Sequence, residues 1–177
     1  MAKIGAKYPC WCSNATGSTG IVLGKLNQAE VTLNTSSGDL FGDDARAEYW
    51  SEFSNGNIAL ETTHLSDENA TAVYGHTASQ GRITCKVGDT APEGKFAYYR
   101  VGMVNGEKCY KFIGYNRVKA TIGNDSDATK GSNITFATDS VNFEIMADMT
   151  TGEYREFETF DTEAAAVTAV KTFCNIT

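Results

Sequence analysis

The segment KFAYYRVGMVNGEKCYKFIGYNRVKA, residues 95–120, constrains the fold most. Two runs rich in aromatic and β-branched residues flank the pair Asn105-Gly106. Asn and Gly tolerate positive φ, which is what the type I′ turn of a two-residue β-hairpin requires. The pattern therefore predicts a β-hairpin here and a fold that is built around antiparallel strands.

Other segments repeat the strand pattern. Residues 19–35 read as two short strands or one long bent strand, residues 56–65 as another, and residues 133–160 as further strands. A turn is expected at residues 150–152, before a further strand run. In these segments apolar residues alternate with polar ones, so that the apolar residues share one face of each strand: Val31, Leu33, Ile58, Leu60, Val141, Phe143 and Ile145.

Two segments carry helix signals. Near 66–75, Ser66 can cap a short helix and Gly75 can end it. Near 162–174, Asp161 or Thr162 can cap a helix whose apolar residues recur at helical spacing, namely Ala166, Val167, Val170, Phe173 and Cys174. The whole chain, residues 1–177, is therefore expected to be a single α+β domain of mainly antiparallel β structure.

Charge and size narrow the range of partners. The formal charge is −7 for 177 residues, which argues against tight nucleic-acid binding because phosphate neutralisation needs clustered Lys and Arg. Anionic membranes are disfavoured for the same reason. No apolar run approaches the roughly 20 residues that span a bilayer, and the start of the chain has no secretory h-region. We expect a chain made in the cytosol without membrane insertion.

Five cysteines, an odd number in a chain of this size, favour free thiols over a disulfide framework. Cys10 and Cys12 would share one face of an extended segment, which raises the possibility of a metal site. Structural zinc needs four ligands in compact pairs, and the remaining cysteines, His64 and His76 are scattered singly. The sequence predicts no metal and no cofactor.

Acidic residues could in principle carry chemistry. Two acidic segments, 38–48 and 123–131, suggest calcium, but neither has the ligand spacing of an EF-hand loop. Glutamates on neighbouring strand runs could serve a glycosidase, although acids on the outer face of a sheet are the commoner explanation. These glutamates are Glu144, Glu153, Glu156 and Glu158. We expect that the protein is not an enzyme.

The most unusual feature is an acidic segment at about residues 36–55, predicted to be a long loop between strands. It carries large aromatic residues, which mark partner sites when they lie exposed, or which fold back over the core. A smaller aromatic cluster lies in a predicted N-terminal arm, about residues 1–18. The candidate interface residues are Phe41, Asp43, Asp44, Tyr49, Trp50 and Phe53 in the loop, and Tyr8 and Trp11 in the arm.

The order of the segments resembles that of a known family. MAKIGAKYPCWC, then AEVTLNTSSGDLFGDDARAEYWSEFSNGNIALET, the LSDENATAVYGH helix, the aromatic hairpin and TDSVNFEIMADMTTGEYREF follow one another. Together they resemble the major tail protein, or tail tube protein, of long-tailed, non-contractile bacteriophages (siphoviruses). The resemblance covers nearly the whole chain and rests on segment order and on VTLNTSSGDLFGDD…GNIALE, not on a catalytic signature.

This resemblance implies a β-sandwich or barrel-like tail tube fold that assembles into closed, usually hexameric rings. The rings would stack into a tube through which DNA passes without specific binding, with the loop and the arm reaching neighbouring subunits. The implied partners are copies of the chain and other tail proteins at the tube ends, and the implied location is the virion after assembly in the host cytoplasm. An alternative from a different class is a monomeric β-sandwich module that binds a cell-surface carbohydrate or protein.

Overall fold

The computed structural model describes residues 2–43, 45–122 and 138–177. Eight strands form one sheet in the order β2-β1-β7-β8-β9-β4-β3, with β10 also paired to β8. Every strand pair in this part of the chain is antiparallel, which confirms the predicted α+β class with mainly antiparallel strands. The strands are β1 (Ala2–Ser13), β2 (Ile21–Val22), β3 (Leu26–Gly42), β4 (Ala45–Thr62), β7 (Glu93–Val104), β8 (Glu107–Thr121), β9 (Asp139–Ile145) and β10 (Glu156–Phe160).

The central hairpin is β7–β8, as predicted. Val104 and Glu107 are cross-strand partners on either side of the turn. Asn105 has φ of 51° and Gly106 has φ of 86°, so both turn residues occupy the left-handed region that a type I′ turn requires. A separate two-stranded ribbon, β5 (Thr77–Ser79) and β6 (Arg82–Thr84), lies beyond the first helix.

The main core lies on one face of the curled sheet. The predicted apolar alternation is confirmed in the inner part of β4, where Ile58 and Leu60 are buried, and in β9, where Val141, Phe143 and Ile145 are buried. Val31 and Leu33 of β3 are partly buried beside them. Phe96 of β7 lies between them, with its ring centroid 5.3 Å from that of Phe143. Burial of these large rings adds to the hydrophobic stabilisation that the aliphatic side chains of the core supply.

Both predicted helices are present. In α1 (Asp67–Tyr74), the Ser66 hydroxyl accepts a hydrogen bond from the Asn69 backbone N–H at 3.3 Å, and Gly75 ends the helix in the left-handed conformation. In α2 (Glu163–Phe173), the cap is Thr162, whose hydroxyl accepts from the Ala165 N–H at 3.3 Å.

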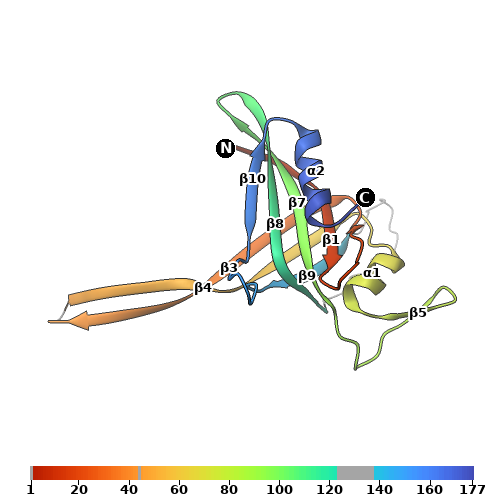
Figure 1. The fold of residues 1–177 in the computed structure, drawn as a ribbon, viewed down its shortest axis with the longest axis horizontal. Coiled ribbons are helices and arrows are strands. Elements are labelled where there is room, and N and C mark those ends of the chain that lie inside the picture. The colour runs from red at the N-terminus through yellow and green to blue at the C-terminus, as the bar shows by residue number, and fades with distance from the viewer. Residues whose placement is uncertain (1, 44, 123–137) are drawn as a thin grey trace, which may run out of the picture.

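Helix α2 covers the sheet face opposite the main core (Figure 1). It packs on β1, β7 and β8, with Ala166 and Val170 on its buried side. Phe173 meets Phe112 of β8 edge-on, with ring centroids 5.5 Å apart. The sheet is therefore buried on both faces over its central strands.

The predicted N-terminal arm is wrong for most of its length, because residues 2–13 form strand β1 of the sheet. Strand β1 pairs with β7 from Ala2 to Ser13, and with β2 at Cys10 and Trp11. Trp11 is only 3% exposed and lies in the main core, while Cys10 and Cys12 are buried on the opposite face under α2. Tyr8 is partly buried at a bulge in β1 and has φ of 62°. Because residues 9–12 are buried on both faces of the sheet, this segment lacks the alternation of apolar and polar residues that predicts a strand.

The predicted loop at 36–55 is also wrong. It is the outer part of a β3–β4 hairpin, in which Ser36 pairs with Glu52 and Gly42 pairs with Ala45. The turn includes Asp43, whose φ is 48°. A two-stranded ribbon with both faces in solvent has no buried side to impose apolar alternation, so its composition resembles that of a loop.

Candidate assembly surface

The outer half of the β3–β4 hairpin extends beyond the rest of the sheet as an arm, which we call the ribbon (residues 36–55) (Figure 1). Strand β9 pairs with β4 only from Gly56 to Thr62. Residues 45–55 of β4 are therefore paired with β3 alone, a length of about 35 Å at 3.3 Å per residue. Isolated two-stranded ribbons are marginally stable in water, so the ribbon gains from any surface that covers it.

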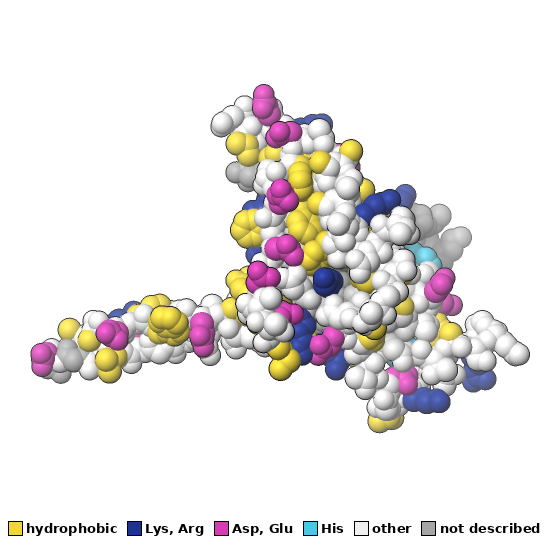
Figure 2. Space-filling model, viewed as in Figure 1, with side chains coloured by type: hydrophobic (Ala, Val, Ile, Leu, Met, Phe, Trp, Pro, Cys, Tyr) yellow, Lys and Arg dark blue, Asp and Glu magenta, His cyan; other side chains and the backbone are white. Residues whose placement is uncertain are grey.

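Large apolar side chains lie exposed near the ribbon end. Trp50 is 71% exposed and Phe41 is 67% exposed, and Leu40 and Tyr49 are exposed as well. Figure 2 shows hydrophobic side chains in yellow among acidic side chains in magenta along the arm. The register pairs Gly38 with Trp50, so Trp50 and Tyr49 project from opposite faces of the ribbon. Both faces therefore offer apolar surface.

Charged groups surround these side chains. The ribbon sequence holds five carboxylates and one arginine, Arg46. Arg46 forms an ion pair with Asp39 and lies over the Tyr49 ring, with its Cζ atom 4.1 Å from the ring centroid. The indole N–H of Trp50 donates a hydrogen bond to Glu52 at 3.4 Å. The ribbon end is thus acidic and aromatic.

The structure brings together only part of the predicted interface set. Phe41, Asp43, Tyr49 and Trp50 lie together on the ribbon, and the remaining ribbon residue of the set, Asp44, lies outside the described residues. Phe53 belongs to the root of the ribbon, where it is partly buried. Its ring stacks on Tyr154 with centroids 3.8 Å apart.

The two N-terminal residues of the set lie in the body of the protein, not on the ribbon. Trp11 is in the main core, and Tyr8 packs beside the α2 face. Trp11 therefore offers no surface to a neighbouring molecule in this structure. An interface role for the exposed ribbon residues stays a prediction.

Sequence reasoning missed an exposed aromatic residue on β10. Strand β10 pairs with β8 along one edge, and no other described strand pairs with its second edge. Phe157 of β10 is 60% exposed. The alternation in EFETF, residues 156–160, was the available signal, but it does not show which of the two faces is covered by α2.

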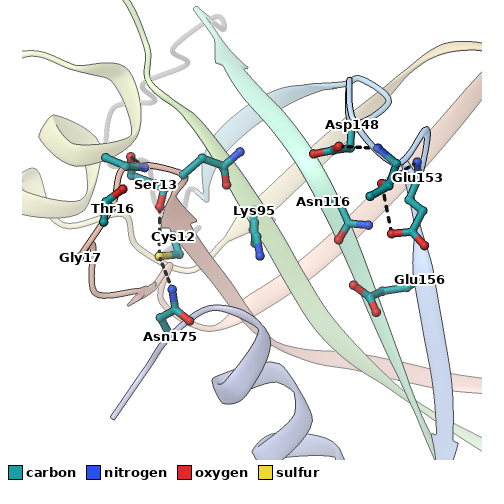
Figure 3. A pocket seen from close by; sticks show the side chains of 13 residues that line it. Cys12, Ser13, Thr16, Gly17, Lys95, Asn116, Asp148, Glu153, Glu156 and Asn175 are labelled. Carbon is teal, nitrogen blue, oxygen red and sulfur yellow. Dashed lines mark hydrogen bonds between the residues drawn. The ribbon is translucent and has the colours of Figure 1, made fainter.

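A polar hollow of about 610 Å³ lies between the β1–β2 connection and the turn that precedes β10 (Figure 3). Two of the carboxylates that line it, Asp148 and Glu153, form hydrogen bonds within that turn. Asp148 accepts hydrogen bonds from the backbone N–H groups of Thr150 and Thr151, at 2.8 and 3.0 Å, which lowers the pKa of its carboxyl. The Thr151 hydroxyl in turn donates to Glu153 at 3.3 Å.

The four glutamates that could serve a glycosidase are not gathered into one site. Glu153 and Glu156 line the polar hollow. Glu158 lines a groove on the α2 face, and Glu144 lies on β9 opposite Lys119 of β8. On the other side of the hollow, the Cys12 thiol donates to the carbonyl of Ser13 at 3.4 Å (Figure 3). It also lies within 3.6 Å of the Ser18 carbonyl.

Within residues 2–43, 45–122 and 138–177, no group of three or more His, Cys, Asp or Glu side chains is arranged to hold a metal ion. The acidic segment 123–131, one of the two that suggested calcium, lies outside the described residues. Neither described helix combines the length and apolar character needed to cross a bilayer.

Comparison with known proteins adds no relative: no model of a protein family matches the chain, and no curated protein matches it. The function must therefore be argued from the residues and their placement.

Proposed function

We propose that the protein is a structural subunit of a phage tail tube. Its copies would assemble into stacked rings that form the conduit for DNA ejection, and the family that the sequence resembles suggests six subunits in each ring. The observation that carries this proposal is the ribbon, a long exposed hairpin with four large apolar side chains at its outer end. Contiguous exposed apolar surface on a soluble protein marks a site of association.

The position of these side chains favours association with a protein surface. They lie on an element that has no core of its own and that extends about 35 Å from the sheet. Burial of Trp and Tyr at the centre of an interface typically supplies most of its affinity. A ribbon that contacts a different surface on an identical copy makes a heterologous contact, and such contacts generate closed rings or open stacks.

The open edge of β10 supports the same proposal. Unpaired strand edges invite pairing with other chains, and closure of a ring of subunits would satisfy them. In a tail tube, pairing of strands between neighbouring subunits would make one continuous barrel. We therefore propose that the chain has the barrel-forming tail tube fold.

The overall charge suits a conduit. A protein with a formal charge of −7 does not attract DNA to its surface as a whole, so DNA could move through without being held. Repulsion between acidic rings is screened over about 8 to 10 Å at physiological ionic strength, which permits stacking.

Sedimentation velocity across a concentration series tests the proposal. The 19.1 kDa chain should convert to much larger species as the concentration rises. A variant in which Asn-Gly replaces residues 37–51 is the matched control, because it joins the cross-strand partners Ser36 and Glu52 by a two-residue turn. A wild-type chain that sediments as a monomer at every concentration, like this variant, would contradict the proposal.

A further inference from the structure

Three cations lie around Phe157 on one face of β7, β8 and β10. Arg100 of β7 pairs with Lys111 of β8, and Lys111 pairs with Thr159 of β10, so their side chains share a face with Phe157. Phe112, the next residue along β8, points to the opposite face and packs under α2. We call Arg100, Lys111, Arg155 and Phe157 the β10 patch.

The cations of the β10 patch contact aromatic groups, not carboxylates. The Lys111 ammonium lies 3.9 Å from the centroid of the Phe157 ring, and the Arg155 guanidinium carbon lies 5.7 Å from it. Arg100 donates a hydrogen bond to the Tyr98 hydroxyl at 3.5 Å. Across the described part of the chain, none of the three cations is ion-paired.

A further observation suggests that the β10 patch receives a partner. Phe157, at the centre of the patch, is exposed on a strand whose second edge pairs with no other described strand. A partner that supplied carboxylates and an apolar face would satisfy the cations and cover the ring together.

The end of the ribbon has the complementary chemistry. Asp43 and Glu48 are exposed and not ion-paired within the described chain, and Leu40, Phe41 and Trp50 lie beside them. An acidic, aromatic strand pair therefore faces solvent on the ribbon, while the β10 patch is a basic, aromatic face. The glutamates of β10, Glu156 and Glu158, lie on the opposite face, beside α2. The two surfaces are opposite in charge, and both expose aromatic side chains.

We propose that the β10 patch is the docking site for the ribbon end of a second copy of this chain. The inference rests on the proposed function, because it names the surface that the ribbon binds. The ribbon cannot reach the patch of its own molecule without bending back. Its root is held beside the patch by the stacking of Phe53 on Tyr154, and its end lies about 35 Å away (Figure 1).

Charge exchange tests the pairing. Lys111→Glu and Glu48→Lys should each raise the concentration of half-assembly, measured by light scattering, by at least about tenfold, because each places like charges in contact. The double variant Lys111→Glu/Glu48→Lys should restore assembly to near the wild-type concentration. Lys25→Glu makes the same charge change on an exposed residue outside both surfaces and should assemble as the wild type does.

Folding of each variant is checked by circular dichroism. If Lys111→Glu lowers the melting temperature, Arg100→Glu replaces it in the same design, again combined with Glu48→Lys. Single variants that assemble like the wild type would overturn the docking site, and so would a double variant that stays as defective as the singles.

The outcomes separate this inference from the proposed function. A wild-type chain that never assembles refutes the tail tube proposal itself, whereas a wild-type chain that assembles alongside normal charge variants refutes only the docking site. DNA is the other anionic ligand that a basic surface could bind. Fluorescence anisotropy of a short DNA duplex measures whether the β10 patch binds it. Loss of that binding in Lys111→Glu without any effect on assembly would assign the β10 patch to nucleic acid and overturn the inference.

Discussion

At the scale of single residues, the two tryptophans have opposite environments and so allow a matched comparison. Trp11 is buried in the main core, and Trp50 is exposed on the ribbon. Trp11→Ala should lower the free energy of unfolding by about 3–5 kcal/mol, because it leaves a large cavity. Urea unfolding followed by circular dichroism measures this change.

Trp50→Ala should leave the free energy of unfolding within about 0.5 kcal/mol of the wild-type value, since an exposed side chain loses few contacts. The same substitution should raise the half-assembly concentration at least about tenfold, as truncation of an aromatic anchor does at other interfaces. Light scattering on both tryptophan variants gives the comparison. Normal assembly of Trp50→Ala would remove Trp50 from the interface.

The cysteines, like the tryptophans, differ in their exposure to solvent. Cys85 is exposed, whereas burial raises the pKa of the Cys10 thiol to about 12 and also raises that of Cys174. Because the thiolate is the reactive form, a thiol reagent at pH 8 should label one cysteine rapidly in the folded protein. Cys85→Ser should abolish this fast phase, and fast labelling that persists in the variant would show that a buried thiol is accessible.

Asp89 makes the stability of the folded protein depend on pH. The backbone N–H of Lys86 donates to its carboxylate at 2.9 Å, and the His76 ring nitrogen Nδ1 lies 3.0 Å from the same oxygen. These contacts hold the pKa of Asp89 below its ordinary value of 3.8. The stabilisation is therefore complete above the pKa of the unfolded chain and is lost as the pH falls through the lower, folded value.

Asp89→Asn should accordingly melt at a lower temperature than the wild type at pH 6, and the difference should shrink as the pH falls below about 4. Thermal melts between pH 3 and pH 6 measure this convergence. A difference in melting temperature that stays constant over the range would show that the Asp89 charge is not the source.

At the scale of elements, the ribbon and the body should be separable. When Asn-Gly replaces residues 37–51, the stacking of Phe53 on Tyr154 and the pairing of β4 with β9 are retained. We therefore expect a variant whose melting temperature is close to that of the wild type and which does not assemble. Loss of cooperative unfolding would mean that the ribbon contributes to the fold of the body.

The elements that could be predicted are those specified by local chemistry. Asn105-Gly106 favours one turn type, and Ser66 and Gly75 mark the ends of α1 through caps that need only neighbouring backbone. Strand β9 was recognisable because one of its faces is buried and the other is less so, which leaves alternation in the sequence.

The elements that the sequence did not predict, β1 and the ribbon, lack this difference in burial between their two faces. Near Trp11, β1 is buried on both faces, and the ribbon is exposed on both, so neither alternates. The β10 patch depends on register, because Lys111 reaches Phe157 only through the pairing of β8 with β10. Such contacts between distant segments leave no local signal in the sequence.

At the scale of the whole molecule, the protein has a sheet that is covered on both faces over its central strands, and a ribbon that extends from this sheet (Figure 1). The ribbon is acidic, and the β10 patch is basic. A surface that projects and a different surface that receives it are what a directional, repeating assembly needs. We propose that the chain is such a repeating subunit and that its copies enclose a channel.

Negative-stain electron microscopy of the purified protein, at concentrations above and below the onset of light scattering, tests that claim most directly. We expect rings or tubes with a central hole at the higher concentration, and none for the Asn-Gly variant that lacks the ribbon end. Compact particles of a single 19.1 kDa chain at every concentration would contradict it.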